Sequence, residues 1–585
     1  MTKTKKSAFL EFLKKHRHKF LVVFFVFLFL VTFIISVSGG LRVFFPYLGD
    51  LTGFPVGQKN YLVIFQNNNE LRPGGGFISS FAKLQLTAGV PTQLQIEDVY
   101  GTIDDHPYQT PPWPMEKLLA NEWYKGYSFR DGNYSPNFPS SAQELIRLYQ
   151  LTRPNEHLDG IIALNYQTLE DLMNALGPLE VEGRWLNQDN LFEEITASVN
   201  DVDRHNLESL ANRKSILKPL SNAIIKKIIF NPFKLRKVSD TITRALDSKD
   251  IQLYFTNQNL QNLALKNGWA GQWPNQAPST SPTSARALKC GISGDFLAVN
   301  EANLGGMKSD RYITRDITYH VKFSEALLNK STYAEAPQAD LSVEVHHYGI
   351  ENIPLSGPYT GYFRLYSCPN QVDTALALQA PATSSDRPDE EIVKLQPGES
   401  KTITRSYPLT TDILSSNREY SLYLAKQSGT QADHYRVIIE LPRGYRVESD
   451  QFQSRENFAY WDGQLNTDKK LTLKILDDEL PPRLVLQENR ELNKISLHFN
   501  EDLNQNYASD PFSYGVTDLN LKHPEKADDI HIRKVVTTSK DVDIFLTGQT
   551  NQPEERYGVT LKNLRDTHGN ILSERQITVV QRLDK

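Results

Sequence analysis

The chain has 585 residues, a formal net charge of −5, 39% hydrophobic residues and 10% aromatic residues. This length exceeds one typical domain, so we expect two to four domains with hydrophobic cores. The acidic balance argues against a nucleic-acid partner, which would need a basic face. Two cysteines, Cys290 and Cys368, make no disulfide-rich scaffold and no zinc-binding spacing, and whether they form one disulfide stays open.

The first forty residues combine a basic segment with a long apolar block. Seven Lys and Arg residues precede Phe20, against Glu11 alone, and nothing charged occurs from Phe20 to Val37. As a helix, this block would rise about 27 Å, the thickness of a bilayer's hydrocarbon core. The pattern predicts a cytoplasmic basic tail (1–19), a transmembrane helix (20–38) and an exported remainder with a charge of about −11.

A cleaved signal peptide is the alternative interpretation, because Ser36-Val37-Ser38 has the small residues of a cleavage site. Apolar regions of signal peptides run about 7–15 residues, and this block is longer, which favours a retained anchor. Both interpretations export the rest of the chain. We therefore expect a single-pass protein of the cell membrane with its N-terminus in the cytoplasm and its bulk extracytoplasmic.

The next part of the chain alternates between strand and helix patterns. Apolar runs and alternating residues predict strands, and i, i+3, i+4 spacing with a capping box predicts helices. Strands are expected at 61–65, 77–86, 94–99, 159–165 and 179–182, and helices at 141–149, 168–176 and 207–230. This alternation predicts a layered α/β domain with a central sheet over residues 55–290.

Beyond a Pro-, Ser- and Thr-rich linker at 272–286, short alternating strands replace the helices. Strands at 312–322, 341–347, 359–366, 401–407 and 435–441 predict an antiparallel β-sandwich over residues 291–475. A second β unit, over residues 481–585, follows the Pro481-Pro482 pair.

Four segments carry a resemblance to a known family. They are Asn67–Phe77 (NNNELRPGGGF), Phe129–Pro139 (FRDGNYSPNFP), Leu158–Leu164 (LDGIIAL) and Leu176–Val181 (LGPLEV). Together they resemble a bacterial membrane-anchored family, the domain-of-unknown-function family 4012, over about residues 55–320. That resemblance implies no established activity.

The middle of this region also resembles, more distantly, the LytR–CpsA–Psr family, through the strand from Asp159, the following helix and 176–181. Members of that family transfer glycopolymers from a lipid pyrophosphate carrier to peptidoglycan. The resemblance implies a related fold, and Arg204 and Arg213 lie where that family's arginines grip pyrophosphate. The chain departs from the family because the arginine–aspartate–threonine strand end and a clear arginine pair are missing.

The C-terminal unit, from about Pro481, resembles the bacterial Ig-like domain of S-layer proteins through Leu497–Leu503 and Tyr557–Asn570. Such modules are usually spacers or adhesive decorations. The expected fold class is therefore multidomain. It comprises an N-terminal single transmembrane helix, an α/β layered domain with a central sheet, a β-sandwich domain and a C-terminal Ig-like β-sandwich.

One loop is the leading candidate for an anion site. Gly74, Gly75 and Gly76 could let backbone N–H groups converge on a phosphate, and Arg72 could add a bidentate contact. The alternative is a permissive turn between two strands.

A second candidate site combines Arg130, which could bind a phosphate, with Asp131, which could hold Mg²⁺. The alternative is a local ion pair that stabilises the loop. Arg204 and Arg213 complete the set of candidate anion ligands, and no structural metal site is expected. Asp104-Asp105-His106 is interpreted as a solvated turn.

No complete catalytic motif occurs, since GxSxG, HExxH and a P-loop are all missing from the sequence. We expect an extracytoplasmic envelope protein that binds a wall or surface glycopolymer or partner proteins, without a cofactor. The alternative is a LytR–CpsA–Psr-like phosphotransferase or pyrophosphate-binding protein acting on lipid-linked glycopolymers, for which Mg²⁺ would be the cofactor. Convergence of the four arginines on one pocket beside an aspartate would favour the enzyme.

Overall fold

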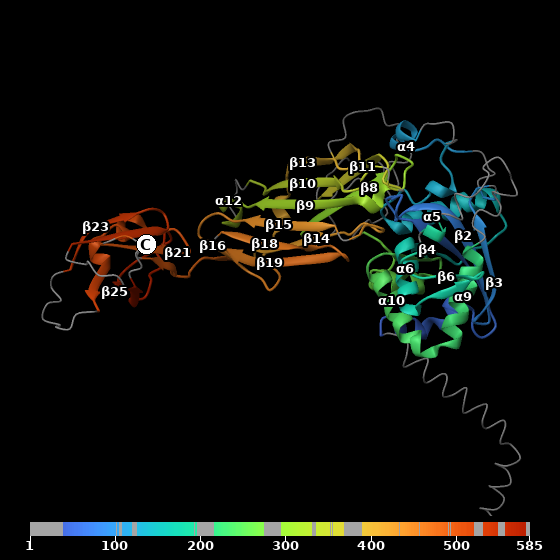
Figure 1. The fold of residues 1–585 in the computed structure, drawn as a ribbon, viewed down its shortest axis with the longest axis horizontal. Helices are drawn as coiled ribbons and strands as arrows, with labels where there is room; N and C mark the ends of the chain where they lie inside the picture. Colours follow the sequence, from blue (N-terminus) through green and yellow to red (C-terminus); the bar gives the residue numbers. More distant parts are fainter. Residues whose placement is uncertain are drawn as a thin grey trace, which may run out of the picture.

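The computed structural model describes residues 39–580 except 101, 104–107, 120–123, 125, 192, 196–215, 274–293, 330–334, 352, 354, 368–388, 432, 456, 489–490, 492, 520–529 and 548–555. Figure 1 shows three parts in a row: an α/β part coloured blue to green, a sandwich coloured yellow to orange, and a small β module coloured red at the far end. Both cysteines and most of the expected linker lie outside the described residues.

The α/β part is built on a five-stranded sheet in the order β3-β2-β1-β4-β7. Only β1 and β4 run parallel, and the other neighbours are antiparallel. The strands are β1 (Gln58–Asn67), β2 (Phe77–Thr87), β3 (Val90–Asp98), β4 (Gly160–Asn165) and β7 (Ile251–Phe255), and β5 (Leu179–Val181) forms a separate hairpin with β6 (Arg184–Leu186).

Helices cover both faces of this sheet because its strands bury apolar residues on both sides. One face packs Leu62 and Phe81 against α5, and the other packs Tyr61 and Phe255 around Trp269. The helices are η1 (Leu41–Tyr47), α3 (Leu48–Thr52), α4 (Trp113–Leu118), η2 (Phe129–Asp131), α5 (Phe138–Thr152), α6 (Tyr166–Leu176), α9 (Leu217–Phe230), η3 (Pro232–Lys234), α10 (Leu235–Asp247) and α11 (Gln258–Lys266).

The sandwich packs two six-stranded sheets, β13-β10-β9-β15-β18-β17 and β12-β11-β8-β14-β19-β16. Alternation fixes which face is buried: Ala339, Leu341, Val343 and Val345 of β10 all point into the shared core. The strands are β8 (Asp295–Asn303), β9 (Ile313–Lys322), β10 (Gln338–His347), β11 (Tyr359–Ser367), β12 (Glu390–Leu395), β13 (Ser400–Pro408), β14 (Glu419–Leu424), β15 (His434–Glu440), β16 (Tyr445–Glu448), β17 (Gln453–Arg455), β18 (Phe458–Gln464) and β19 (Lys469–Asp477), with η4 (Ser309–Tyr312), α12 (Glu325–Leu328) and η5 (Thr411–Ile413) between them.

The α/β part and the sandwich share apolar clusters. Ala302, Leu304 and Tyr362 of the sandwich belong to the cluster that covers one face of the α/β sheet. Trp273, which follows the α/β part, packs on Phe296 with ring centroids 5.4 Å apart. Because both clusters are continuous across the boundary, the two parts form one packed body.

The C-terminal module has a four-stranded sheet, β20-β21-β24-β23, and a three-stranded sheet, β22-β25-β26. Ile495, Leu497, Ile544 and Val559 are among the residues of its core. Its elements are β20 (Leu484–Glu488), β21 (Lys494–Phe499), α14 (Gln505–Ala508), η6 (Pro511–Ser513), β22 (Tyr514–Asp518), β23 (His531–Thr537), β24 (Asp541–Thr547), β25 (Arg556–Leu561) and β26 (Arg575–Val580).

The structure corrects the expected fold class and location. Among the described residues no helix is long and apolar enough to cross a membrane, and α5, with 15 residues, falls short of the roughly 20 that a span requires. The segments 1–19 and 20–38 lie outside the described residues. The predictions of a transmembrane helix and of a single-pass location in the cell membrane, with the N-terminus cytoplasmic, are therefore not retained.

The antiparallel sandwich is also corrected, because both of its sheets are mixed. The strand β15 pairs in parallel with β9, and β14 pairs in parallel with β8. Each parallel pair joins strands that are more than a hundred residues apart in sequence, so local alternation carries no information about their direction. The chain is a multidomain, β-rich protein with mixed sheets.

A carboxylate cluster lies where the sandwich meets the C-terminal module. The side-chain amide of Asn570 donates to the backbone oxygen of Asp478 at 2.9 Å, and Arg443 pairs with Asp502 at 2.9 Å. Burial, together with the nearby Asp478 and Asp566, raises the pKa of Glu501 to about 7 from an ordinary 4.5. Between pH 4.5 and about pH 7 the folded module therefore keeps the Glu501 carboxyl protonated, whereas the unfolded chain has released that proton.

This cluster predicts that the C-terminal module loses stability as the pH rises from about 4.5 to 7, because the folded state binds the proton more tightly. Glu501→Gln should abolish that slope and stabilise the module at pH 8 by roughly 1 kcal/mol, allowing for solvent screening. Calorimetric unfolding of the full chain across this range measures the effect. Glu491→Gln, which alters an exposed carboxylate of the same module, should keep the slope, and an unchanged slope in Glu501→Gln would contradict the assignment.

Candidate functional site

The parallel pair of strands marks the edge of the α/β sheet where a ligand is expected. In such sheets ligands bind beyond the carboxyl ends of parallel strands. Here those ends are Gln66 of β1 and Asn165 of β4, which lie opposite each other. The glycine-rich loop 67–76 begins at Asn67, the last residue of β1, so the sequence brings its candidate anion site to this edge.

The edge is filled by a segment of the sandwich, residues 425–433 between β14 and β15, which we call the tongue. Asn68 donates its side-chain amide to the backbone oxygen of Gly429 at 3.2 Å. Asn165 donates to the Ser428 hydroxyl oxygen at 3.1 Å. The amide nitrogens of Asn68 and Asn165 therefore bond to the tongue, whereas the buried oxygens Gln66 Oε1, Asn68 Oδ1 and Asn165 Oδ1 have no hydrogen-bond partner within the described part of the structure.

Lys249 also holds the tongue in place. The Ser428 hydroxyl donates to the backbone oxygen of Lys249 at 2.6 Å, and Lys249 Nζ donates to the backbone oxygen of Lys426 at 3.1 Å. Lys249 Nζ also pairs with Asp468 at 2.6 Å. Burial lowers the pKa of Lys426.

We call the contact of the tongue and its neighbouring strands with the α/β part the joint. Two glycines, Gly429 of the tongue and Gly75 of the glycine-rich loop, lie close together in it. Gly429 has φ +86°, and a Cβ built on it would lie 2.1 Å from the backbone oxygen of Gly75 and 2.8 Å from Leu71 Cδ1. Any side chain at position 429 would therefore push the tongue away from the glycine-rich loop.

The backbone of the glycine-rich loop is already hydrogen-bonded within the protein. The N–H of Gly74 donates to the backbone oxygen of Asn133 and that of Gly75 to the backbone oxygen of Arg72, both at 2.9 Å. A Cβ on Gly75, whose φ is +139°, would lie 2.4 Å from Gln66 Oε1. These glycines thus permit close packing.

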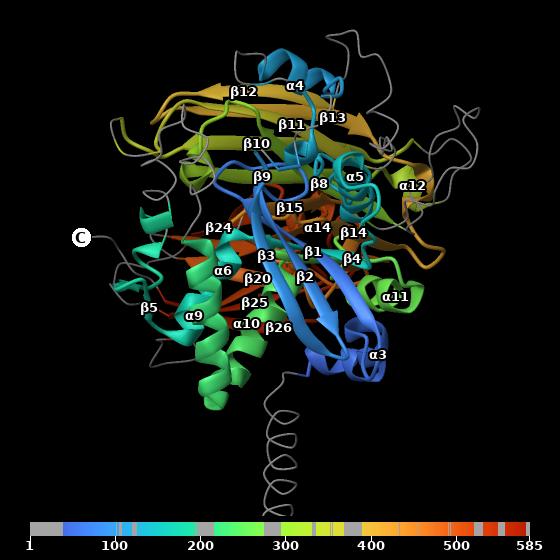
Figure 2. The same cartoon turned by 90° about the vertical axis from the view of Figure 1, so that its right-hand side faces the viewer.

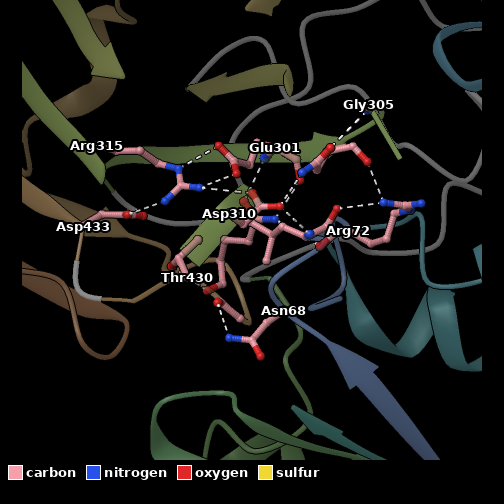
Figure 3. Close-up of polar contacts among 12 residues, drawn as sticks. Asn68, Arg72, Glu301, Gly305, Asp310, Arg315, Thr430 and Asp433 are labelled. Atoms are coloured by element: carbon pink, nitrogen blue, oxygen red, sulfur yellow. Dashed lines mark hydrogen bonds and ion pairs between the residues drawn. The ribbon is translucent and has the colours of Figure 1, made fainter. Parts of the chain in front are cut away.

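Arg72 points from this loop into the sandwich and is 1% exposed. Its Nη1 donates to the backbone oxygen of Asn303 at 2.6 Å, and its Nη2 pairs with Glu70 at 3.1 Å. Its guanidinium lies 5.1 Å from the ring centroid of Phe77. Figure 3 shows the contact between Arg72 and the end of β8.

A buried ionic network continues from Arg72 along the joint (Figure 3). Arg315 of β9 donates through Nε to Glu301 at 2.7 Å and through Nη1 to Asp433 at 3.1 Å. Asp310 accepts hydrogen bonds from the Leu71 N–H at 2.9 Å and from the Asn303 amide at 2.6 Å. The network therefore links the glycine-rich loop, β8, β9 and the tongue.

Burial controls the protonation of this network. Burial, followed by the charge of Glu301, raises the pKa of Asp310. Burial acts to lower the pKa of Arg315, but Glu301 and Asp433 outweigh it and the pKa is raised. Arg315 thus remains charged, and burial disfavours the charged form of Asp310.

The second candidate loop lies beside the first. Arg130 and Asp131, 5% and 1% exposed, form an ion pair at 3.6 Å. The guanidinium of Arg130 lies 5.4–5.6 Å from the ring centroids of Tyr100, Tyr108 and Tyr124.

Tyr124 packs against this second loop, and its hydroxyl donates to Asp131 at 3.4 Å. Burial and then Asp131 raise its pKa, whereas Arg130 and Arg72 act to lower it. The N–H of Gly74 donates to the backbone oxygen of Asn133, so the two loops adjoin, and both bury their candidate side chains, Arg72, Arg130 and Asp131. Arg204 and Arg213 lie outside the described residues, as does the Asp104-Asp105-His106 turn.

The sequence interpretation missed Glu301, Arg315 and Asp433, which hold the joint. The signal for Arg315 was in the register of its strand, because 313, 315, 317 and 319 all face inward. A charged residue in an otherwise apolar inward row indicates a buried partner of opposite charge. In the described part of the chain, no group of three or more His, Cys, Asp or Glu residues is placed to hold a metal ion.

Known structures give only distant likenesses. The N-terminal part of the bacterial S-layer protein SbsC is 14% identical over 18% of this chain and 24% of that chain, with a TM-score of 0.16. Lin1025 from Listeria innocua is 12% identical (37% and 78% coverage, TM-score 0.21), and the transcriptional regulator yvhJ from Bacillus subtilis is 13% identical (37% and 77%, TM-score 0.18). No curated protein matches the chain.

The family comparison is specific. The model of a protein family of unknown function, DUF4012, matches residues 56–199, which contain β1, the glycine-rich loop and the Arg130–Asp131 loop. The LytR–CpsA–Psr and S-layer Ig-like resemblances find no such confirmation. The expected resemblance to this family of unknown function is thus confirmed over residues 56–199, which carry both candidate loops.

Proposed function

We propose that this chain is a surface-associated binding protein of the cell envelope, which holds a glycopolymer or a partner protein and performs no chemistry itself. One observation carries the proposal: the carboxyl edge of β1 and β4, where a substrate would sit, is occupied by the tongue through Gly429 and Ser428. A substrate that binds at such an edge needs open space there.

The burial of the candidate cations supports the same proposal. A phosphotransferase would need to place cationic groups and backbone N–H donors against a phosphate. Arg72 and Arg130 are 1% and 5% exposed, and both donate to backbone oxygens of the chain itself. The N–H groups of Gly74 and Gly75 are also bonded. Arg72 lies on one of two adjoining loops and Arg130 and Asp131 on the other, which is the feature that favours the enzyme.

The arrangement of the parts further supports a binding role. The α/β part and the C-terminal module lie at opposite ends of the sandwich in Figure 1. Because the tongue and the shared apolar clusters lock the α/β part to the sandwich, these two parts move as one body. Such a body can present a binding surface at one end and connect through the module at the other.

A binding and turnover comparison tests this proposal. Purified full chain should co-sediment saturably with isolated envelope polysaccharide and release no phosphate from a lipid-linked glycopolymer. The enzyme would be established instead if the parent turned over this substrate and Arg72→Ala abolished turnover without changing the unfolding midpoint. Arg147→Ala, on the exposed side of α5, is the control and should leave that turnover intact. Absence of co-sedimentation would also contradict the binding role.

A further inference from the structure

The helical corner formed by α9, η3 and α10 is strongly basic in an acidic protein. Residues 217–247 contain seven Lys and Arg against Asp240 and Asp247, whereas the whole chain has a net charge of −5. The two helices meet at the lower end of the view in Figure 2, on the side away from β12 and β13. None of the hydrogen bonds and ion pairs described above between the α/β part and the sandwich involves a residue of this corner.

The apolar sides of the two helices are used within the fold. Leu220 of α9 packs with the β5–β6 hairpin, and Val238 of α10 packs with Leu176 of α6. Five of the seven basic side chains are exposed: Lys218, Lys226, Arg236, Lys237 and Arg244. A solvated charged face is the ordinary outcome for such helices, so a further observation is needed to identify a site.

That observation is an unpacked aromatic ring in the same stretch of chain as the cations. Phe233 of η3 is 94% exposed, although a phenylalanine normally gains stability by burial. Lys226, Arg236 and Lys237 flank it in the sequence and are all exposed. Arg236 has only the loose i, i+4 contact with Asp240, at 3.8 Å.

Two further lysines are held side by side at the same corner. Lys227 Nζ donates to the backbone oxygen of Pro178 at 2.6 Å, and Lys234 Nζ donates to that of Leu176. Both sit at the C-terminal end of α6, where the helix dipole favours cations. Burial and then the charge of Lys234 lower the pKa of Lys227.

We propose that this basic corner, comprising Lys226, Lys227, Phe233, Lys234, Arg236 and Lys237, binds the phosphate groups of an anionic glycopolymer. The inference rests on the proposed function and specifies the class of its ligand. Several cations on one face raise the local concentration of a polyanion and release its counterions on binding. The exposed ring of Phe233 offers an apolar surface to the sugar part of the chain.

The distribution of charge favours a polymer over a single small anion. Lys227 and Lys234 are tied to backbone oxygens, while Lys226, Arg236 and Lys237 extend into solvent from two different helices. Because these cations are spread over the surface, each can contact a different phosphate of a polymer with repeating phosphate groups. A lipid surface fits less well, because Ile225 and Phe233 are the large apolar side chains of the described corner that are exposed, and interfacial binding buries a broader apolar face.

The test uses the full chain and soluble long-chain inorganic polyphosphate as the probe. The triple charge reversal Lys226→Glu, Arg236→Glu and Lys237→Glu avoids the two lysines that hold α6. The matched control reverses three exposed sandwich lysines, Lys394, Lys470 and Lys474, and changes the net charge equally. The parent and the control should bind with affinities within about twofold of each other, and the corner variant should bind roughly tenfold or more weakly.

Each other outcome overturns the inference. Failure of the parent to bind polyphosphate, or equal weakening in both triple variants, would show that no specific site exists at the corner. Binding to phosphatidylglycerol vesicles without binding to polyphosphate would identify a lipid surface as the ligand. Unfolding midpoints matching the parent show that each variant is folded.

Co-sedimentation with envelope polysaccharide separates this inference from the proposed function. If the parent and the corner variant both co-sediment, the basic corner is refuted as the polymer site while the binding role stands. If the parent fails to co-sediment but binds polyphosphate through the corner, the envelope role is refuted and a polyanion site remains.

Discussion

Replacing Arg315 with alanine should destabilise the packed body of α/β part and sandwich by about 3–5 kcal/mol, because it leaves a buried acidic cluster without its cation. Arg315 has a side-chain exposure of 4% and pairs with Glu301 and Asp433, whose side chains are 1% and 7% exposed. Both carboxylates would then have to take up protons, or water would have to enter the buried cluster. Urea unfolding of the full chain, followed by tryptophan fluorescence, measures the loss.

Arg436→Ala is the matched control for this substitution. Arg436 lies on β15 of the same sheet and also pairs with an aspartate, Asp462, at 3.0 Å, but both side chains are about half-exposed. Exposed ion pairs contribute about 0–1 kcal/mol, so the midpoint should hardly move. Equal effects from Arg315→Ala and Arg436→Ala would mean that burial of the network contributes nothing to the joint.

Local sequence patterns predicted most of the elements that lie within one segment of chain. The strand expected at 77–86 is β2 (Phe77–Thr87), and the strand expected at 159–165 is β4 (Gly160–Asn165). The helix expected from Ser141 begins earlier, at Phe138, because Pro139 at its first turn needs no backbone hydrogen-bond partner. The strand β7 was missed, although its residues pair with β4.

Strand direction and the site depended on contacts that no local pattern encodes. Arg72 looked like an anion ligand because it precedes three glycines, yet it donates to Asn303, 231 residues away. The tongue has no motif of its own: Gly429 and Ser428 become important only because the fold brings them to Gly75 and Asn165. Inward register, as at Arg315, is the kind of local signal that could have pointed to the joint.

Gly429→Ala should weaken the joint more than any other single change in the tongue. An alanine Cβ would meet the backbone oxygen of Gly75 at 2.1 Å, and no flexible side chain can move aside to relieve that contact. The tongue must therefore shift, which strains the hydrogen bonds from Asn68 to Gly429 and from Asn165 to Ser428. Overpacking of this kind costs about 1–3 kcal/mol beyond the cost of the positive φ.

Gly398→Ala separates the two costs, because Gly398 has φ +87° but nothing within 4 Å of its added Cβ. Both variants carry the backbone strain of about 1 kcal/mol, and only Gly429→Ala carries the collision. Hydrogen exchange measured by mass spectrometry should show faster exchange at 67–76 and 425–433 in Gly429→Ala alone. If the two variants unfold at the same midpoint and exchange alike, then the tongue does not close the carboxyl edge of β1 and β4. That edge would then be free to open for a ligand.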